Sequence, residues 1–388
     1  MNFARTEEQR AIVEAVAAVV ARFDEAYWLE REKTASHPKE FHAAMAEGGW
    51  LGVAMPEAVG GAGLGILETA LVMATVADSP GAMAAASAIH LNIFGPHAIC
   101  VFGTEDQKRT LLPPIIAGEV TCCFGVTEPD AGLETGNITT RAEKIGDGWR
   151  ISGRKIWTSA AQNADRIILL VRTTPKQDCA RSTDGLTLFF ADMDRAKVEA
   201  RVIPKMGRAA VDSNMLFIDG LEVPDERRIG VVDEGFKCLL HSLNPERILV
   251  AAEALGIGRQ ALSRASDYAK ERVVFGRPIG QNQAIQHPLA KCWVALEAAE
   301  LLTLRAAWLY DQGEECGAAA NAAKYFAAEA GFEAAEQAVL TLGGMGYAQE
   351  YHVERLFREA WIPRLAPVTA QLMLCYIAEK VLGQPRSY

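Results

Sequence analysis

The sequence predicts an α+β fold in three parts. An N-terminal α-helical domain is expected over residues 1–120, a middle antiparallel, barrel-like β domain over 121–232, and a C-terminal α-helical bundle over 233–388. Two observations predict this order. The chain has 388 residues, half of them apolar, which is enough for several packed layers. Its periodicity also changes from helical to strand-like near Thr121 and back to helical at about Gly235.

The first domain is predicted to begin with a helix. Residues Thr6–Gln9 have the sequence TEEQ, a capping-box pattern, and apolar residues follow at helical spacing. These are Ile12, Val13, Val16, Val19, Val20 and Phe23. The segment Met55–Gly65 interrupts the helical pattern, and its glycines predict an irregular loop.

The middle domain is predicted from four short β-rich stretches. They are RIILLVRT, GLTLFFADM, VEARVIPKM and NMLFIDGLEV, separated by Gly, Asp and Pro residues. A further stretch, KIGDGWRISGRKIWTS, predicts a hairpin that turns at Gly146–Gly148. A compact antiparallel sheet or barrel fits these patterns.

The C-terminal domain is predicted from three long alanine- and leucine-rich stretches. They begin at ERILVAAEALG, HPLAKCWVALE and AANAAKYFAAE. Their wide apolar faces indicate a helical bundle, and such faces often continue into a subunit interface. Alanine-rich composition alone would give the same bundle without any chemistry.

Composition limits the partners of the chain. The net charge is −10 and no run of lysine and arginine is present, which argues against nucleic acid or an anionic membrane as the main partner. A polyanionic small ligand held by a few arginines stays compatible with this charge.

The cysteine and histidine patterns indicate neither disulfides nor a metal site. Eight cysteines are scattered without a CxxC pair, which predicts reduced and mostly buried thiols. The seven histidines form no HExxH or HxxxH pair, so no metal is expected. We expect no membrane span, because no apolar run in the sequence approaches the roughly 20 residues that a span needs. The acidic start differs from a signal peptide, so a cytoplasmic location is expected.

Four ordered motifs resemble those of the acyl-CoA dehydrogenase family. They are PEAVGGAGLG in the first domain, FGVTEPDAG with KIWTS in the second, and ERVVFGRPIGQNQAIQ and LGGMGYAQEYHVERLFREA in the third. The resemblance spans nearly the whole chain. It implies an α–β–α architecture, bound FAD, an acyl-CoA substrate, electron transfer to an electron-transfer flavoprotein, and a homotetramer built as a dimer of dimers.

The resemblance implies a flavin-binding wall in the middle domain. Phe124, Val126 and Thr127 would lie along the isoalloxazine ring. Trp157 would cover a ring face, and Ser159 would bond near N5. An apolar wall with a few placed donors suits a flavin ring. Taken alone, Trp157 would more often be a core residue.

Other flavin contacts are implied in the C-terminal domain. Arg272 and Phe275 resemble a pair that reaches the FAD of a neighbouring subunit, where the arginine meets the pyrophosphate. Further contacts are implied for Gln283, Gly343, Gly344, Thr369 and Gln371. Taken alone, Arg272 would more often be a surface charge, and the double glycine a helix terminus.

Glu246 is predicted to be the catalytic base. A thioester α-proton is weakly acidic, so the chemistry needs a desolvated carboxylate. Many relatives place this glutamate after the sequence REA, but here that position holds Pro367. Isovaleryl-CoA-like and long-chain-like members place it on a bundle helix before an arginine, where this chain has Glu246 and Arg247. The alternative is a first-turn helix glutamate that follows Pro245.

Pro367 also removes a hydrogen-bond donor. In relatives the backbone N–H at this position, with a flavin ribityl hydroxyl, polarises the thioester carbonyl, and proline has no N–H. Either the N–H of Val368 takes over through a shifted loop, which is the hypothesis preferred here, or the hydroxyl acts with another donor.

Several positions expected to bind the carrier differ from relatives. Leu133 and Glu134 replace a Ser-Asp pair near the pantetheine, and Asn244 replaces an aspartate. Arg247 would aid the same region or hold the loop, and Leu340 replaces a glutamine near the adenine. These changes leave CoA and a carrier-protein phosphopantetheine both open.

The predicted function is FAD-dependent α,β-dehydrogenation of an acyl-CoA to the 2-enoyl-CoA in fatty acid metabolism. An acyl-thioester oxidase or flavin monooxygenase of the same superfamily is the nearest alternative. A non-catalytic or nucleic-acid-binding flavoprotein is a third, which the charge of −10 and the presence of Glu246 disfavour.

Overall fold

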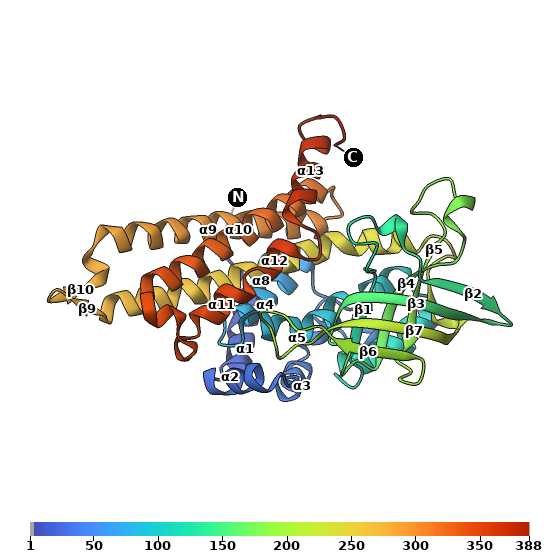
Figure 1. The fold of residues 1–388 in the computed structure, drawn as a ribbon, viewed down its shortest axis with the longest axis horizontal. Coiled ribbons are helices and arrows are strands. Elements are labelled where there is room, and N and C mark those ends of the chain that lie inside the picture. The colour runs from blue at the N-terminus through green and yellow to red at the C-terminus, as the bar shows by residue number, and fades with distance from the viewer. Residues whose placement is uncertain (1–3, 388) are drawn as a thin grey trace.

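One long helix organises the molecule. The structure, a computed structural model, describes residues 4–387. In it α8 (Gly235–Glu271) is 37 residues long, which is about 55 Å at 1.5 Å per residue. Figure 1 shows α8 running from the β domain to the opposite tip of the molecule. Residues on α8 can therefore contact all three domains.

The N-terminal domain is helical, as predicted. Thr6 and Gln9 form the predicted capping box at the start of the first helix. Met55–Gly65 contains only the short helix η2 (Glu57–Val59), so the predicted irregular loop is present. The helices are α1 (Glu7–Val20), α2 (Glu25–Thr34), α3 (Lys39–Glu47), α4 (Ile66–Ala77), α5 (Ala82–Phe94), α6 (His97–Phe102) and α7 (Glu105–Ile116).

The middle domain is an eight-stranded sheet with strand order β6-β7-β3-β2-β4-β5-β8, and β1 joins it beside β4. The predicted hairpin is present, because β2 pairs antiparallel with β3 on either side of Gly146. The sheet is not wholly antiparallel, since β1 and β2 both pair with β4 in parallel. The strands are β1 (Cys122–Gly125), β2 (Arg141–Ile145), β3 (Gly148–Ser159), β4 (Arg166–Arg172), β5 (Leu186–Asp192), β6 (Val198–Val202), β7 (Ser213–Pro224) and β8 (Arg228–Ile229).

Strand β4 is buried on both faces and ties the sheet to the helices. Its alternate residues Ile168 and Leu170 pack with α6 and α7. The residues that alternate with them along the strand are Ile167, Leu169 and Val171, which pack inside the sheet with residues of β3, β5 and β7. This alternation explains why RIILLVRT is almost continuously apolar.

The C-terminal domain is the predicted helical bundle, with close packing between α8 and α10. A Cβ on Gly331 would lie 2.3 Å from the carbonyl oxygen of Ala254, so only glycine permits this approach. The remaining elements are the hairpin β9 (Val273–Val274) and β10 (Arg277–Pro278), then α9 (Gln283–Asp311), α10 (Gly317–Leu342), α11 (Val353–Glu359), α12 (Ile362–Leu365) and α13 (Ala370–Lys380).

One apolar stretch is longer than the sequence suggested. Helical residues Ala82–Phe102, which comprise α5 and α6, are long and apolar enough to cross a membrane by length and composition. The buried share of this stretch is 67%, because α5 packs inside the protein against α4 and α8. A buried core helix passes the same test, so burial explains its composition. All eight cysteines are free thiols, five of them buried.

Candidate active site

Glu246 lies in the interior of α8 and is buried. The first-turn alternative is wrong, because α8 begins at Gly235 and includes Pro245. Glu246 is 7% exposed, and its Oε2 atom has no hydrogen-bond partner. Burial raises the pKa of its carboxyl to about 7, although nearby cations oppose this change. A desolvated carboxylate with no donor on one oxygen is a stronger base than an exposed one.

Two cations, Arg247 and Lys324, favour the charged form of Glu246. The guanidinium of Arg247 donates to Asn244 Oδ1 at 3.2 Å, and its Nε atom is buried without a partner. Lys324 of α10 is fully buried, and burial lowers the pKa of its ammonium to about 7 while Glu246 opposes this shift. Lys324 Nζ donates to the carbonyl oxygen of Val368 at 2.6 Å. Lys324 therefore links the region of the base to the loop before α13.

A buried ion pair also lies close enough to Glu246 to influence its charge. His90 of α5 and Glu253 of α8 approach to 2.6 Å between Nδ1 and Oε1. Burial alone would lower the pKa of His90, but the charge and hydrogen bond of Glu253 and the charge of Glu246 raise it. The ion pair with Glu253 therefore favours the charged form of His90. The seven-residue spacing of the two glutamates signals their shared helix face, whereas no sequence pattern signals His90.

The predicted flavin wall is formed by β1 and β3. Phe124 lies on β1, and the ring of Phe94 packs edge-on against it at 5.4 Å. Thr127 follows β1 and accepts a hydrogen bond from the N–H of Ile156 at 2.9 Å. Trp157 lies where the pairing of β3 with β7 is irregular, at φ 61°, and is 56% exposed. The structure thus presents a large indole beside the end of β1.

A buried lysine holds this wall together. Lys155 Nζ donates to the carbonyl oxygens of Val126 and Leu170 at 2.9 and 2.7 Å and to Glu128 Oε1 at 2.9 Å. Burial lowers the pKa of Lys155 to about 8, which Glu128 opposes. Burial would raise the pKa of Glu128, but Lys155 and bonds from Thr139 and Thr140 lower it to about 2. Sequence reasoning did not identify this pair.

A buried arginine contacts the last predicted residue of the wall. Arg208 donates to Ser159 Oγ at 3.1 Å, to Ser213 Oγ at 3.3 Å and to Ser87 Oγ of α5 at 2.9 Å. Its partners are neutral hydroxyls, so its charge is not cancelled by direct contact. The sequence reasoning missed Arg208, which precedes β7 in an irregular loop.

Five of the remaining predicted flavin contacts lie at the far tip of the molecule. Arg272 is the C-cap of α8, and Phe275 lies at the turn of the β9–β10 hairpin, fully exposed at φ 53°. Gln283 begins α9 nearby, and Gly343 and Gly344 follow the end of α10. Figure 1 shows this tip at the opposite end of α8 from the sheet. One chain therefore does not bring both groups together.

The residues predicted near the thioester and carrier are only partly gathered. Val368 is buried, and its N–H has no hydrogen-bond acceptor within residues 4–387. The next residues, Thr369 and Gln371, were predicted to contact the flavin; Thr369 is the N-cap of α13, with Gln371 exposed in its first turn. Leu133 is 55% exposed on a loop of the middle domain. Asn244 and Arg247 are close to Glu246 through their places on α8.

These residues fit a flat aromatic cofactor. The half-exposed indole of Trp157 and the partly buried ring of Phe124 form an apolar wall, with the hydroxyl of Ser159 as a polar group. A Cβ on Gly343 or Gly344 would meet no atom within 4 Å, so open space adjoins this backbone. An exposed apolar wall beside polar groups is what an isoalloxazine ring requires.

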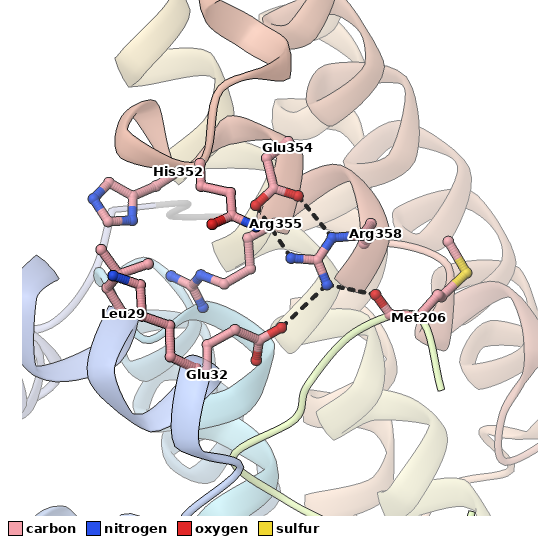
Figure 2. Close-up of a pocket in the computed structure, with 9 residues that line it drawn as sticks. Leu29, Glu32, Met206, His352, Glu354, Arg355 and Arg358 are labelled. Atoms are coloured by element: carbon pink, nitrogen blue, oxygen red, sulfur yellow. Dashed lines mark hydrogen bonds and ion pairs between the residues drawn. The ribbon is translucent and has the colours of Figure 1, made fainter. Parts of the chain in front are cut away.

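A charged cavity lies away from Glu246. It has a volume of about 330 Å³ and lies between α2 and α11. Figure 2 shows Arg358 there between Glu354 and Glu32, with a bond to the carbonyl of Met206. Glu32 also accepts from the N–H of Ala209 at 2.8 Å. This network clamps the loop that carries Arg208 and does not contain the predicted base.

Comparisons with known proteins identify the family. Models of the N-terminal, middle and C-terminal domains of acyl-CoA dehydrogenase match residues 6–119, 123–221 and 233–382. Acyl-CoA dehydrogenase FadE12 of Mycobacterium tuberculosis is 38% identical over 393 residues, with 100% of this chain and 99% of that protein covered. The caffeyl-CoA reductase-Etf complex subunit CarC of Acetobacterium woodii is 32% identical, with 91% and 92% covered.

A solved structure leads to the same family. The glutaryl-coenzyme A dehydrogenase in complex with glutaryl-CoA has a TM-score of 0.93 and 30% identity, covering 100% of this chain and 98% of that one. The predicted three-domain fold is therefore confirmed. The chain belongs to the acyl-CoA dehydrogenase family and is an oxidoreductase that acts on acyl-CoA.

Proposed function

We propose that this enzyme binds FAD and uses Glu246 to remove the α-proton of an acyl-CoA, giving the 2-enoyl-CoA. The observation that carries the proposal is the state of Glu246. Its carboxylate is buried, one oxygen has no partner, and burial raises its pKa to about 7. No carboxylate replaces it at Pro367.

The cofactor would be held by two protomers. Phe124, Trp157 and Ser159 of one chain would form the wall, and Arg272 and Phe275 of a neighbouring chain would close the site. The distance between the two groups along α8 supports this division. FAD, when bound, supplies the acceptor for the β-hydride. A site shared in this way requires at least a dimer, and the family resemblance implies that two such dimers form a homotetramer.

Side-chain and backbone groups of the protein would orient the thioester. Val368 is proposed to donate its N–H to the thioester carbonyl, because Lys324 fixes the carbonyl of the same residue at 2.6 Å. A preorganised donor at a developing oxyanion typically contributes 10²–10³ in rate. Asn244 and Arg247, which adjoin Glu246 on α8 and share a hydrogen bond of 3.2 Å, would meet the carrier end of the substrate.

An electron-transfer flavoprotein is the proposed electron acceptor. The support is that a relative is named as a subunit of a complex with Etf. An oxidase would instead release peroxide in air. Slow reoxidation in air after anaerobic reduction, and fast reoxidation by an electron-transfer flavoprotein, are expected.

Anaerobic titration of the holoenzyme with acyl-CoAs tests the proposal. The flavin absorbance should bleach with the wild type, and Glu246→Gln should slow bleaching by about 10²–10⁴ while retaining FAD. Asp267→Asn is the matched control, because Asp267 lies on the same helix with an exposed side chain. Unchanged bleaching in Glu246→Gln would remove Glu246 from the mechanism.

A further inference from the structure

The buried pair of His90 and Glu253 lies beside the base. Their side chains are only 12% and 4% exposed, and they join α5 to α8. Glu253 follows Glu246 by seven residues, which is two turns or about 10 Å along the axis, so both carboxylates leave the same face of α8. The sequence of α8 therefore places a second acid in line with the base.

His90 and Glu253 bond each other, and each keeps one more atom that can form a hydrogen bond. His90 uses Nδ1 to meet Glu253, and its Nε2 has no hydrogen-bond partner among the described residues 4–387. Only one oxygen of Glu253 is engaged by His90. An imidazolium–carboxylate pair is neutral as a whole, and it can still donate from the ring and accept at the carboxylate.

The pair also lies next to the predicted flavin wall. The ring of His90 is 5.6 Å from that of Phe94, which in turn packs against Phe124 of β1. Ser87, one turn before His90 on α5, accepts from Arg208, the residue that also bonds Ser159. His90 thus stands between the wall and α8.

The charged groups around Lys324 differ from those around His90. The charges that influence Lys324 are those of Glu246, Arg247 and Glu329. Those that influence His90 are Glu253, Glu246 and Arg208. Glu246 therefore interacts both with Lys324, which bonds Val368, and with His90, which bonds Glu253. With its thioester at Val368 and its α-carbon at Glu246, an acyl group would reach His90 by extending along this series of groups.

We propose that His90 and Glu253 select acyl-CoA substrates whose acyl group carries a neutral hydrogen-bonding group, a hydroxyl or ketone, beyond the β-carbon. This inference rests on the proposed function. A plain alkyl chain would leave the free donor and acceptor of the pair without partners in a site that excludes water, and such a site rejects analogues that lack the polar group. A carboxylate would add a third acid beside Glu246 and Glu253.

A substrate panel tests the selection. The wild-type holoenzyme is reduced anaerobically by acyl-CoAs of equal length: unsubstituted, hydroxyl- or keto-substituted at successive positions beyond the β-carbon, and carboxylate-terminated. We expect the kcat/KM of at least one hydroxyl- or keto-substituted substrate to exceed those of the unsubstituted and the carboxylate-terminated substrates by about tenfold or more. A preference for the alkyl or carboxylate compound, or no preference, overturns the inference.

A paired substitution tests the residues. His90→Leu/Glu253→Leu removes both charges together, since removing one would leave the other buried and unpaired. It should reduce the polar-over-alkyl ratio by about tenfold or more, while bleaching by the alkyl substrate persists. Arg259→Met/Glu300→Gln, which removes an ion pair of 2.7 Å further along α8, is the control and should leave the ratio unchanged.

The outcomes separate the two proposals. If no acyl-CoA bleaches the flavin of the wild type, the proposed function fails. If bleaching occurs but the paired variant lowers all rates equally, the pair is only structural and this inference fails alone. His90→Gln, which keeps a donor in place, should retain the polar preference, and its loss there would equally contradict recognition by hydrogen bonding.

Discussion

The surroundings of Glu246 suit a carboxylate that is proposed to take a proton from a weakly acidic carbon. Burial on α8 favours its neutral form, and the charges of His90, Arg247 and Lys324 partly restore the anion. The balance places its pKa at about 7. A carboxyl with an ordinary pKa would be ionised at neutral pH but too weak to take the proton.

The pH dependence of flavin reduction should follow Glu246. The base acts only when deprotonated, so kcat/KM for an acyl-CoA should rise with pH through about 7 and be lost below it. Rapid-scan measurement of flavin bleaching between about pH 5 and 9 checks this rise. A profile that is flat across this range would mean that no group with this raised pKa takes the proton.

Lys324 should affect both the base and the loop before α13. In Lys324→Met the carbonyl of Val368 loses its donor, and Glu246 loses a cation that favours its anion. The maximal reduction rate should fall by about tenfold or more, and the midpoint of the pH profile should move upward. Lys324→Arg, which keeps the charge, should restore the midpoint. A variant with an unchanged midpoint would show that Lys324 has no charge effect on the base.

At the residue scale, some side chains of the candidate site could be predicted from the sequence and others could not. Glu246 was identifiable because its motif survives in the chain, and Trp157 because KIWTS does. His90, Arg208 and Lys324 act through contacts between distant elements, and a single sequence contains no signal for such contacts. Glu253 is intermediate, because its spacing from Glu246 is visible but its partner is not.

At the element scale the periodic segments were the easier part. The hairpin at Gly146 and the capping box at Thr6 have local signals and were predicted correctly. The start of α8 was harder, because Pro245 inside a helix looks like a helix start. The parallel pairing of β1 with β4 depends on long-range packing and was not expected.

The clamp between α2 and α11 should control the loop that carries Arg208. In Glu32→Ala the N–H of Ala209 and the guanidinium of Arg358 both lose a partner. The free energy of unfolding should fall by about 1–3 kcal/mol, measured by urea denaturation, and FAD retention should decrease. Glu40→Ala removes an acid that is 61% exposed, so it should cost less than about 1 kcal/mol. Equal losses in both variants would contradict the clamp.

At the scale of the whole molecule, the two groups of residues that were predicted to contact the flavin lie far apart. The α–β–α order followed from changes in periodicity, but the spatial separation of Trp157 from Phe275 required the structure. The 37 residues of α8 set this separation. The length of this helix thus determines an arrangement that no local pattern in the sequence describes.

Phe275 should matter for the cofactor only in the assembled enzyme. Its side chain is fully exposed in one chain, so Phe275→Ala should not reduce the stability of the isolated fold. Loss of the ring from a shared site should weaken FAD binding by about tenfold or more. The ratio of FAD to protein on serial dilution measures this change. Val202→Ala, at another exposed apolar position, should retain FAD. Equal retention in both would exclude Phe275 from the site.

The length of α8 has a genetic consequence. Glu246 and Arg272 lie about 39 Å apart on one rigid helix, so in the proposed assembly a chain would give its acid to one centre and its arginine to another. Two inactive chains, Glu246→Gln and Arg272→Leu, should therefore complement each other when co-expressed. Each hybrid dimer regains one intact centre, and random mixing should return about a quarter of the wild-type activity. An absence of rescue would mean that each protomer serves only itself.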